Sequence, residues 1–312
     1  LTLCGDILLL AYQVMVPGEE PAGFEVYDVS DAINPKKIGF FDASGPHSQG
    51  VHFLSMMDGR YVHISTGAAD FEPNNPKDHQ FYMIVDMIDP TNPKEVGRWW
   101  MPGQWAAGGE KINPAWDREP RCHHPLRLGD RLYVSYWHAG FVILGIEDMS
   151  KPRFISGLDW SPPFPWPTHT TLPIPFPIQG RRVMLVADED VAQAYPSSPS
   201  FLWMVDITDE AHPMPFASFQ LDDVDGSPQP PMSGCHQPCE IVTGTEIPVA
   251  WFAGGLRVVD IARPHAPTEV AHFLPDPPPG SERVSSNDVT VDENGLIFLL
   301  DRVRGLHILE RT

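Results

Sequence analysis

FYMIVDMIDPTNPKEVG, residues 81–97, decides the fold, because the same pattern recurs along the chain. The other copies are FEVYDVSDAINPKKIG (24–39), FVILGIEDMSKPRFIS (141–156), FLWMVDITDEAHPMPFA (201–217) and LRVVDIARPHAPTEVA (256–271), with a truncated GLHILE at 305–310. Four copies carry an aspartate seven residues before a proline, at Asp28, Asp86, Asp206 and Asp260. The third copy has Gly145 in that place, and Pro152 keeps the spacing. This fixed offset indicates a duplicated unit.

Each repeat is expected to form about four antiparallel strands. The segment before each aspartate is rich in β-branched and aromatic residues, and the turn that follows combines Asp or Asn with Pro. A further strand pair precedes it, as in 50–66 and 123–137, where DG and GD mark hairpins. Four-stranded repeats are typical of propeller blades, so we expect a single all-β propeller domain, 1–312. The blade-like repeats lie at about 1–44, 45–104, 119–160, 166–221, 233–275 and 284–312, the first and last incomplete.

The phrases VYDVSDAINPKKIG and MIVDMIDPTNPKEVG resemble the LVIVD-repeat family of β-propellers over nearly the whole chain. Similar members carry a further N-terminal blade, so the resemblance implies seven blades, six of which are visible here. We expect the missing outer strand to come from residues before Leu1.

Composition restricts the class of partner. The chain has 312 residues, 42% of them hydrophobic, and a formal charge of −20, which argues against nucleic acid and anionic membranes. No apolar run approaches 20 residues, so no membrane span is expected. Four cysteines and the absence of a recognisable signal segment favour the cytoplasm. The expected partner is a small-molecule substrate, and assembly into a homo-oligomer stays open.

Histidines recur where the chain enters the innermost strand of successive blades. These are His52, His124, His169 and His236, and the sixth repeat has Asn287 in the same place. Pro35 to His52 and Pro152 to His169 are both 17 residues, which places these two at one position of the repeat. Inner strands line the axis of a propeller, so these imidazoles are expected to converge there.

Four neutral imidazoles form a good site for one divalent transition metal, iron first, with manganese, zinc or copper as alternatives. The architecture resembles that of the carotenoid-cleavage oxygenases, which hold iron with four histidines, and that of the selenium-binding proteins. Glu240 and Asp190 are the expected proton carriers, and Asp188, Glu189 and Asp288 are further carboxylates near the inner strands. His123 competes with His124, because only one of two adjacent strand residues can face the axis.

The sequence therefore predicts a metal-dependent enzyme, with oxygenase chemistry favoured over hydrolase or lyase chemistry. A proline-rich aromatic segment, 159–180, and the insertions 98–105 and 185–203 are interpreted as an apolar wall for a small, apolar or aromatic substrate. The cysteines beside the histidines, Cys122, Cys235 and Cys239, lack the paired spacing of a structural zinc site. The alternative hypothesis is a non-catalytic propeller that binds a protein or a glycan.

Overall fold

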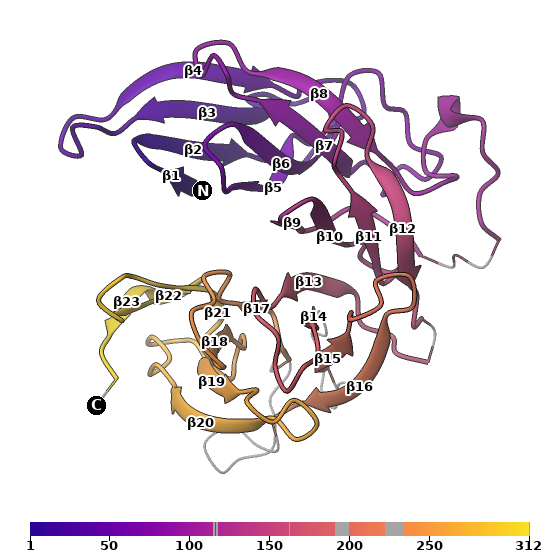
Figure 1. The fold of residues 1–312 in the computed structure, drawn as a ribbon. Coiled ribbons are helices and arrows are strands. Elements are labelled where there is room, and N and C mark those ends of the chain that lie inside the picture. The colour runs from indigo at the N-terminus through magenta and orange to yellow at the C-terminus, as the bar shows by residue number, and fades with distance from the viewer. Residues whose placement is uncertain are drawn as a thin grey trace. The chain divides into compact units, whose positions relative to one another are not determined.

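The structure is a computed structural model that describes residues 1–311 except 115, 117, 162, 191–199, 222–231 and 233. These residues form strands and one short 3-10 helix, η1 (Ala106–Gly108). The chain divides into two compact units, Leu1–Asp159 and Trp160–Thr312, and each unit holds three antiparallel sheets (Figure 1). These sheets are blades of a β-propeller, which confirms the predicted all-β fold; the described residues form six blades.

The first unit contains three four-stranded sheets whose strands follow one another in chain order. The first sheet consists of β1 (Thr2–Cys4), β2 (Ile7–Tyr12), β3 (Gly23–Asp28) and β4 (Lys36–Asp42). The second consists of β5 (Val51–Met56), β6 (Tyr61–Thr66), β7 (Phe81–Asp86) and β8 (Lys94–Trp99). The third consists of β9 (Pro125–Leu128), β10 (Arg131–Ser135), β11 (Phe141–Gly145) and β12 (Arg153–Leu158). The first strands of consecutive sheets are neighbours, since β5 contacts both β1 and β9.

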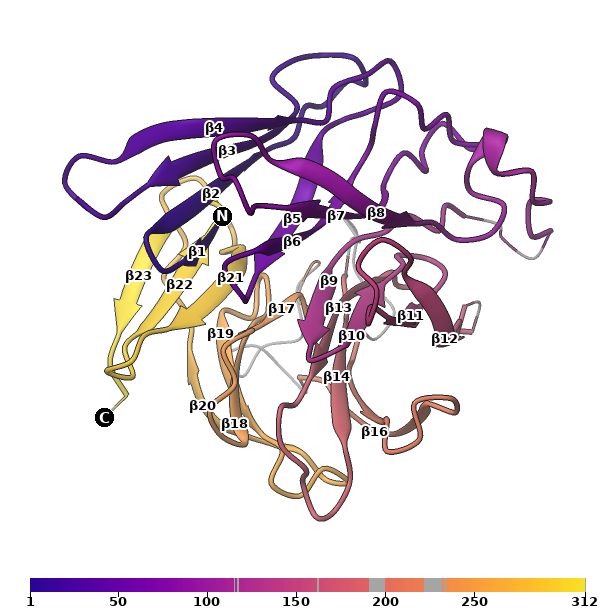
Figure 2. The same ribbon diagram turned by 45° about the horizontal axis from the view of Figure 1, so that its top comes forward.

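The second unit repeats this order, as Figures 1 and 2 show. Its first sheet consists of β13 (Thr168–Pro173), β14 (Val183–Asp188), β15 (Leu202–Asp206) and β16 (Met214–Phe219). The next consists of β17 (Gln237–Pro238), β18 (Glu246–Ala250), β19 (Leu256–Asp260) and β20 (Thr268–Phe273). The last has three described strands, β21 (Ser286–Val291), β22 (Ile297–Asp301) and β23 (Gly305–Leu309). Strand β17 contacts both β13 and β21, so the first strands are again neighbours.

The repeated aspartate stabilises the turn between the third and fourth strands of a sheet. In each of the four repeats that have it, its Oδ1 accepts the main-chain N–H of the residue two positions later, at 2.9 Å. The pairs are Asp28 with Ser30, Asp86 with Ile88, Asp206 with Thr208 and Asp260 with Ala262. This is the local side-chain bond that makes Asp a turn residue.

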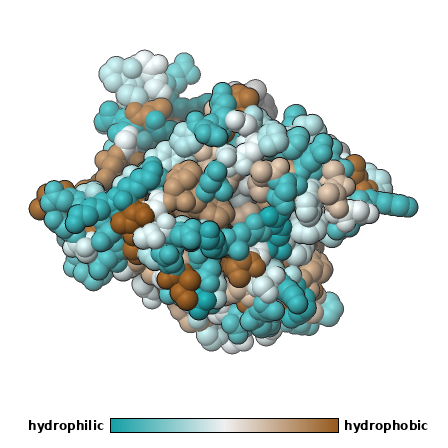
Figure 3. Space-filling model, turned by 90° about the horizontal axis from the view of Figure 1, so that it is seen from above, coloured by the Kyte–Doolittle hydropathy of each residue, from teal (hydrophilic) through white to brown (hydrophobic). Residues whose placement is uncertain are grey.

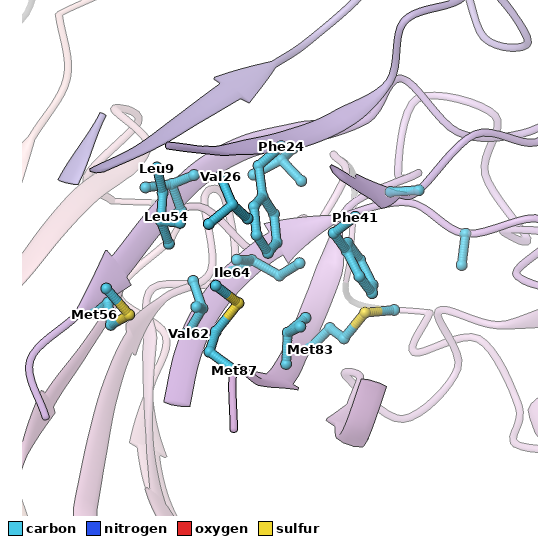
Figure 4. Packing of buried hydrophobic residues seen from close by; sticks show 14 of the residues in the cluster. Leu9, Phe24, Val26, Phe41, Leu54, Met56, Val62, Ile64, Met83 and Met87 are labelled. Atoms are coloured by element: carbon cyan, nitrogen blue, oxygen red, sulfur yellow. The ribbon is translucent and has the colours of Figure 1, made fainter. Parts of the chain in front are cut away.

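Burial on both faces explains the continuous apolar run FYMIV in β7. Phe81, Met83 and Val85 pack into the core shared with the first sheet, whereas Tyr82 and Ile84 pack toward the third sheet. Successive side chains of a strand point to opposite faces, so a sheet between two others needs apolar residues at every position. Figure 4 shows the first of these cores, where Leu9, Phe24 and Val26 meet Val62 and Ile64.

The surface that Figure 3 shows carries hydrophobic side chains scattered among hydrophilic ones. A search of the helices in the described part of the chain finds none long and apolar enough to cross a membrane.

Candidate metal centre

The innermost strands carry a β-bulge at the repeat position of the predicted ligands. In β5, β13 and β21 one residue is skipped by the pairing with the next strand. The skipped residues are His52, His169 and Asn287. A bulge leaves the extra residue outside the ladder and re-aims its side chain. The repeat position that these residues share is therefore the position of a β-bulge.

In the second unit, His169, Glu189 and His236 form a buried cluster. One ligand atom from each lies within 4.8 Å of the others. The rings of His169 and His236 have centroids 3.9 Å apart, and His236 Nε2 is 3.8 Å from Glu189 Oε1. The three residues are 3%, 9% and 5% exposed in chain order. A metal bound by these three buried residues would be largely shielded from bulk water.

The backbone fixes the positions of all three side chains. His169 sits in the bulge of β13, and Glu189 follows β14, where its main-chain N–H donates to Pro167 O at 2.8 Å. His236 precedes β17, and its N–H donates to Ala250 O at 3.2 Å. Three adjacent strands thus present two imidazoles and one carboxylate to the same place.

Hydrogen bonds at Nδ1 fix the tautomers of the two imidazoles. His236 Nδ1 lies 2.5 Å from the main-chain oxygen of Asn287, which can only accept, so His236 carries its proton on Nδ1. His169 Nδ1 lies 2.6 Å from Thr170 Oγ1, which itself donates to Gln237 Oε1 at 2.8 Å. In both rings Nε2 is then the nitrogen that carries the lone pair. An outer hydrogen bond of this kind orients metal-ligating histidines.

A buried polar atom near His236 lacks a hydrogen-bond partner in the described part of the chain. Asn287 Oδ1 is buried and has no hydrogen-bond partner among the described residues, and Asn287 is the residue whose main-chain oxygen holds His236. Buried polar atoms in native proteins are normally paired.

Two histidines and one carboxylate form a donor set found in metal enzymes. Non-haem iron oxygenases and several zinc hydrolases hold their metal with these three ligands and leave positions open for water or substrate. The described side chains of this unit therefore fit a divalent transition metal, without fixing which one.

The two predicted proton carriers lie in this unit. Asp190 is 1% exposed and directly follows Glu189. Glu240 Oε1 accepts from Gln237 Nε2 at 2.9 Å, and burial together with the charge of Asp288 raises the pKa of Glu240 to about 8.

Asp188 links the cluster to a group of aromatic side chains. Its Oδ2 accepts from Trp203 Nε1 at 2.9 Å and from the Phe201 main-chain N–H at 3.1 Å, and burial raises the pKa of this carboxyl to about 7. Trp203 stacks on Trp160 with centroids 5.3 Å apart and meets Phe164 edge-on at 4.8 Å. Two residues of the predicted aromatic wall, Phe201 and Trp203, thus bind the residue that precedes Glu189 in the chain. Residues 191–199 of the insertion 185–203 and Pro162 fall outside the described residues.

In the first unit, three imidazoles form a hydrogen-bonded chain. His52 Nδ1 lies 2.9 Å from Gln13 Oε1, His52 Nε2 lies 2.8 Å from His123 Nε2, and His123 Nδ1 lies 2.8 Å from His124 Nδ1. Burial, with the charges of Arg121 and His79, lowers the pKa of His52 to about 4, so this ring is neutral at pH 7. Each neutral ring has one N–H donor and one acceptor nitrogen, so the hydrogen bonds of this chain can all run in the same direction.

His123 rather than His124 contacts His52 directly, since the ring centroids of His52 and His124 are 6.3 Å apart. The expectation that only one of the two faces the axis stays a prediction. Both residues precede β9, and their rings lie 4.8 Å apart.

The four predicted ligands fall two in each unit. The structure brings His169 and His236 together, and it adds Glu189, which the sequence offered only as one of several carboxylates. His52 and His124 belong to the separate imidazole chain. A single centre built from all four stays a prediction. The signal for Glu189 was its place directly after β14, the strand that pairs with the His169 strand.

The cysteines beside the histidines are free thiols. Burial raises the pKa of Cys122 and Cys235 well above the usual range and that of Cys239 to about 11. These thiols are therefore protonated at neutral pH, and a protonated thiol is a poor metal ligand because the thiolate is the form that binds.

Comparisons with known proteins agree with the fold. Residues 248–274 match the LVIVD repeat, which confirms the repeat expected from the sequence. No curated protein matches the chain. A solved protein from Lactobacillus plantarum is 10% identical, with a TM-score of 0.64, and the match covers 98% of this chain and 81% of that one.

Two further solved structures are similar. The periplasmic gluconolactonase of Pseudomonas aeruginosa is 15% identical, with a TM-score of 0.62 and coverage of 97% and 82%. A hypothetical selenium-binding protein from Sulfolobus tokodaii is 12% identical, with a TM-score of 0.56 and coverage of 92% and 71%. At these identities the likeness shows the fold alone.

Proposed function

We propose that this protein is a metal-dependent enzyme whose metal is held by His169, Glu189 and His236. The observation that carries the proposal is the arrangement of these three buried side chains, with their ligand atoms within 4.8 Å and both imidazoles presenting Nε2. A structural metal site normally uses four protein ligands, whereas three leave room for a reactant.

The metal would supply a Lewis acid that polarises a substrate oxygen or activates water or O₂. We place iron and oxygenase chemistry first, because two histidines and one carboxylate are the donor set of non-haem iron oxygenases. Zinc with hydrolase or lyase chemistry comes second. Asp190 or Glu240 would carry the proton.

The aromatic group Trp160, Phe164, Phe201 and Trp203 supports an apolar or aromatic organic substrate. Its members contact one another through ring faces and edges, and the Asp188 carboxylate that holds Trp203 adjoins Glu189. Phe164, Phe201 and Trp203 keep part of their surface exposed. An aromatic surface next to a ligand carboxylate would place a flat apolar molecule beside the metal.

The proposal also includes the number of blades and the compartment. A seven-bladed propeller rests on the resemblance of the repeats to the LVIVD-repeat family. The four free cysteines support a reducing compartment such as the cytoplasm.

Metal analysis of the purified protein tests the proposal. We expect about one equivalent of a transition metal, lost in His169→Ala and His236→Ala and retained in the control His212→Ala, because the His212 side chain is 83% exposed in a turn. A native protein that holds no metal after reconstitution with Fe²⁺ or Zn²⁺ would contradict the enzyme proposal. It would favour the protein- or glycan-binding alternative.

A further inference from the structure

Beyond the proposed ligands, a line of buried side chains runs from His169 to Glu240. Thr170 Oγ1 lies 2.6 Å from His169 Nδ1 and 2.8 Å from Gln237 Oε1, and Gln237 Nε2 lies 2.9 Å from Glu240 Oε1. Thr170 and Gln237 are 0% and 4% exposed. The line crosses from β13 to β17 and thus joins two adjacent sheets of the second unit.

The chemistry of each group allows one direction when Glu240 is ionised. A carboxylate only accepts, so Gln237 must turn its Nε2 toward Glu240 and its Oε1 toward Thr170. The Thr170 hydroxyl must then donate to Gln237, which leaves its lone pairs for His169. His169 must in turn donate from Nδ1. The carboxylate at one end therefore determines the tautomer of the imidazole at the other.

A second contact supports this orientation of the amide. Gln237 Nε2 also lies 3.3 Å from the main-chain oxygen of Pro238, a group that only accepts. The opposite orientation would bring two oxygens together at that contact. The Gln237 amide is thus held by acceptors on its nitrogen side.

We propose that Thr170, Gln237 and Glu240 form a positioning relay that holds His169 as its Nδ1–H tautomer and so presents Nε2 to the metal. The inference rests on the proposed function, since it assigns these residues a role toward that centre. In the relay they act as positioning residues, because Thr170 alone touches a ligand and the relay places none of the three against the metal. Removal of such outer hydrogen bonds typically weakens metal binding by about 10- to 100-fold.

The tautomer of His169 can be measured in the metal-free protein. Long-range ¹⁵N–¹H correlation at pH 9, where Glu240 is ionised, should show a protonated Nδ1 and an unprotonated Nε2 for His169. In Thr170→Val, which keeps the side-chain shape without the hydroxyl, we expect the Nε2–H tautomer to become populated. Gln237→Leu should do the same, and Thr170→Ser should keep the wild-type pattern.

Metal titration supplies the second readout. Co²⁺ binding, followed by its visible absorption, should weaken about 10- to 100-fold in Thr170→Val and Gln237→Leu and stay close to wild type in Thr170→Ser. Circular dichroism confirms that each variant is folded. A wild-type His169 protonated on Nε2, or a Thr170→Val variant with unchanged tautomer and affinity, would overturn the relay. A wild type that binds no Co²⁺ but shows the Nδ1–H tautomer would refute the metal centre and keep the relay.

Discussion

Glu189→Gln is the most informative single change, because it removes the only carboxylate of the proposed ligand set and keeps the size of the side chain. Glu189 is 9% exposed and its Oε1 lies 3.8 Å from His236 Nε2. The amide can still reach the metal through oxygen, but it is neutral and a weaker donor. We therefore expect weaker metal binding with an intact fold.

The magnitude follows from the number of ligands. A structural zinc site with four protein ligands binds with about 10–16 kcal/mol, or about 2.5–4 kcal/mol for each ligand. Each 1.4 kcal/mol is about tenfold in Kd, so the loss of one ligand corresponds to roughly 100- to 1,000-fold. Because the amide oxygen keeps some affinity, we expect about 100-fold.

The assay is a competition titration of Zn²⁺ against a chromophoric chelator at pH 7.5. The matched control is Glu246→Gln, which makes the same charge change at a half-exposed ion pair with Arg311. Wild type and control should bind alike. A Glu189→Gln protein whose Kd stays within threefold of wild type would refute the assignment of Glu189 as a ligand.

Three further predictions concern stability. Burial lowers the pKa of His63 from 6.5 to about 3, so below pH 6.5 the unfolded chain takes up a proton that the folded protein does not bind. Between pH 6.5 and 5, the amount by which wild type is more stable than His63→Asn should therefore fall by about 2 kcal/mol. A difference in urea unfolding that does not change with pH would contradict this. Because Ile64 is fully buried in the core of Figure 4, Ile64→Ala should lower the free energy of unfolding by about 2–5 kcal/mol and Ile64→Val by about 0.5–1.5 kcal/mol. A loss below about 1 kcal/mol for the alanine variant would contradict the placement of Ile64 in this core. Gly255 has φ +74, and a Cβ there would lie 2.4 Å from Phe273 O, so Gly255→Ala should destabilise the protein by at least about 1–2 kcal/mol. The control Gly244→Ala should not, because its Cβ would meet nothing within 4 Å. Equal melting temperatures for the two variants would contradict this.

The fold could be predicted from the sequence because its signals are local. The aspartate that accepts an N–H two residues later acts within its own turn, so its spacing is visible in the chain. The apolar run of β7 likewise reflects burial on both faces of one strand. Such local signals do not determine the number of blades, because that number depends on every strand of the propeller.

The candidate site could be predicted only in part. The repeat predicted one shared position for His52 and His169, and both residues lie in a bulge of their strand. Glu189 could not be distinguished from its neighbours Asp188 and Asp190, because the choice among three adjacent carboxylates depends on the exact end of β14. The contact between His52 and His123 was missed because both His123 and His124 lie before β9, where strand alternation gives no guidance.

An anomalous-scattering scan at transition-metal edges, on crystals of protein never exposed to chelators, tests the central claim most directly. The account predicts one peak within coordination distance of His169 Nε2, His236 Nε2 and a Glu189 oxygen. Density that shows these three side chains bonded to one another or to water alone, with no anomalous peak, would contradict it.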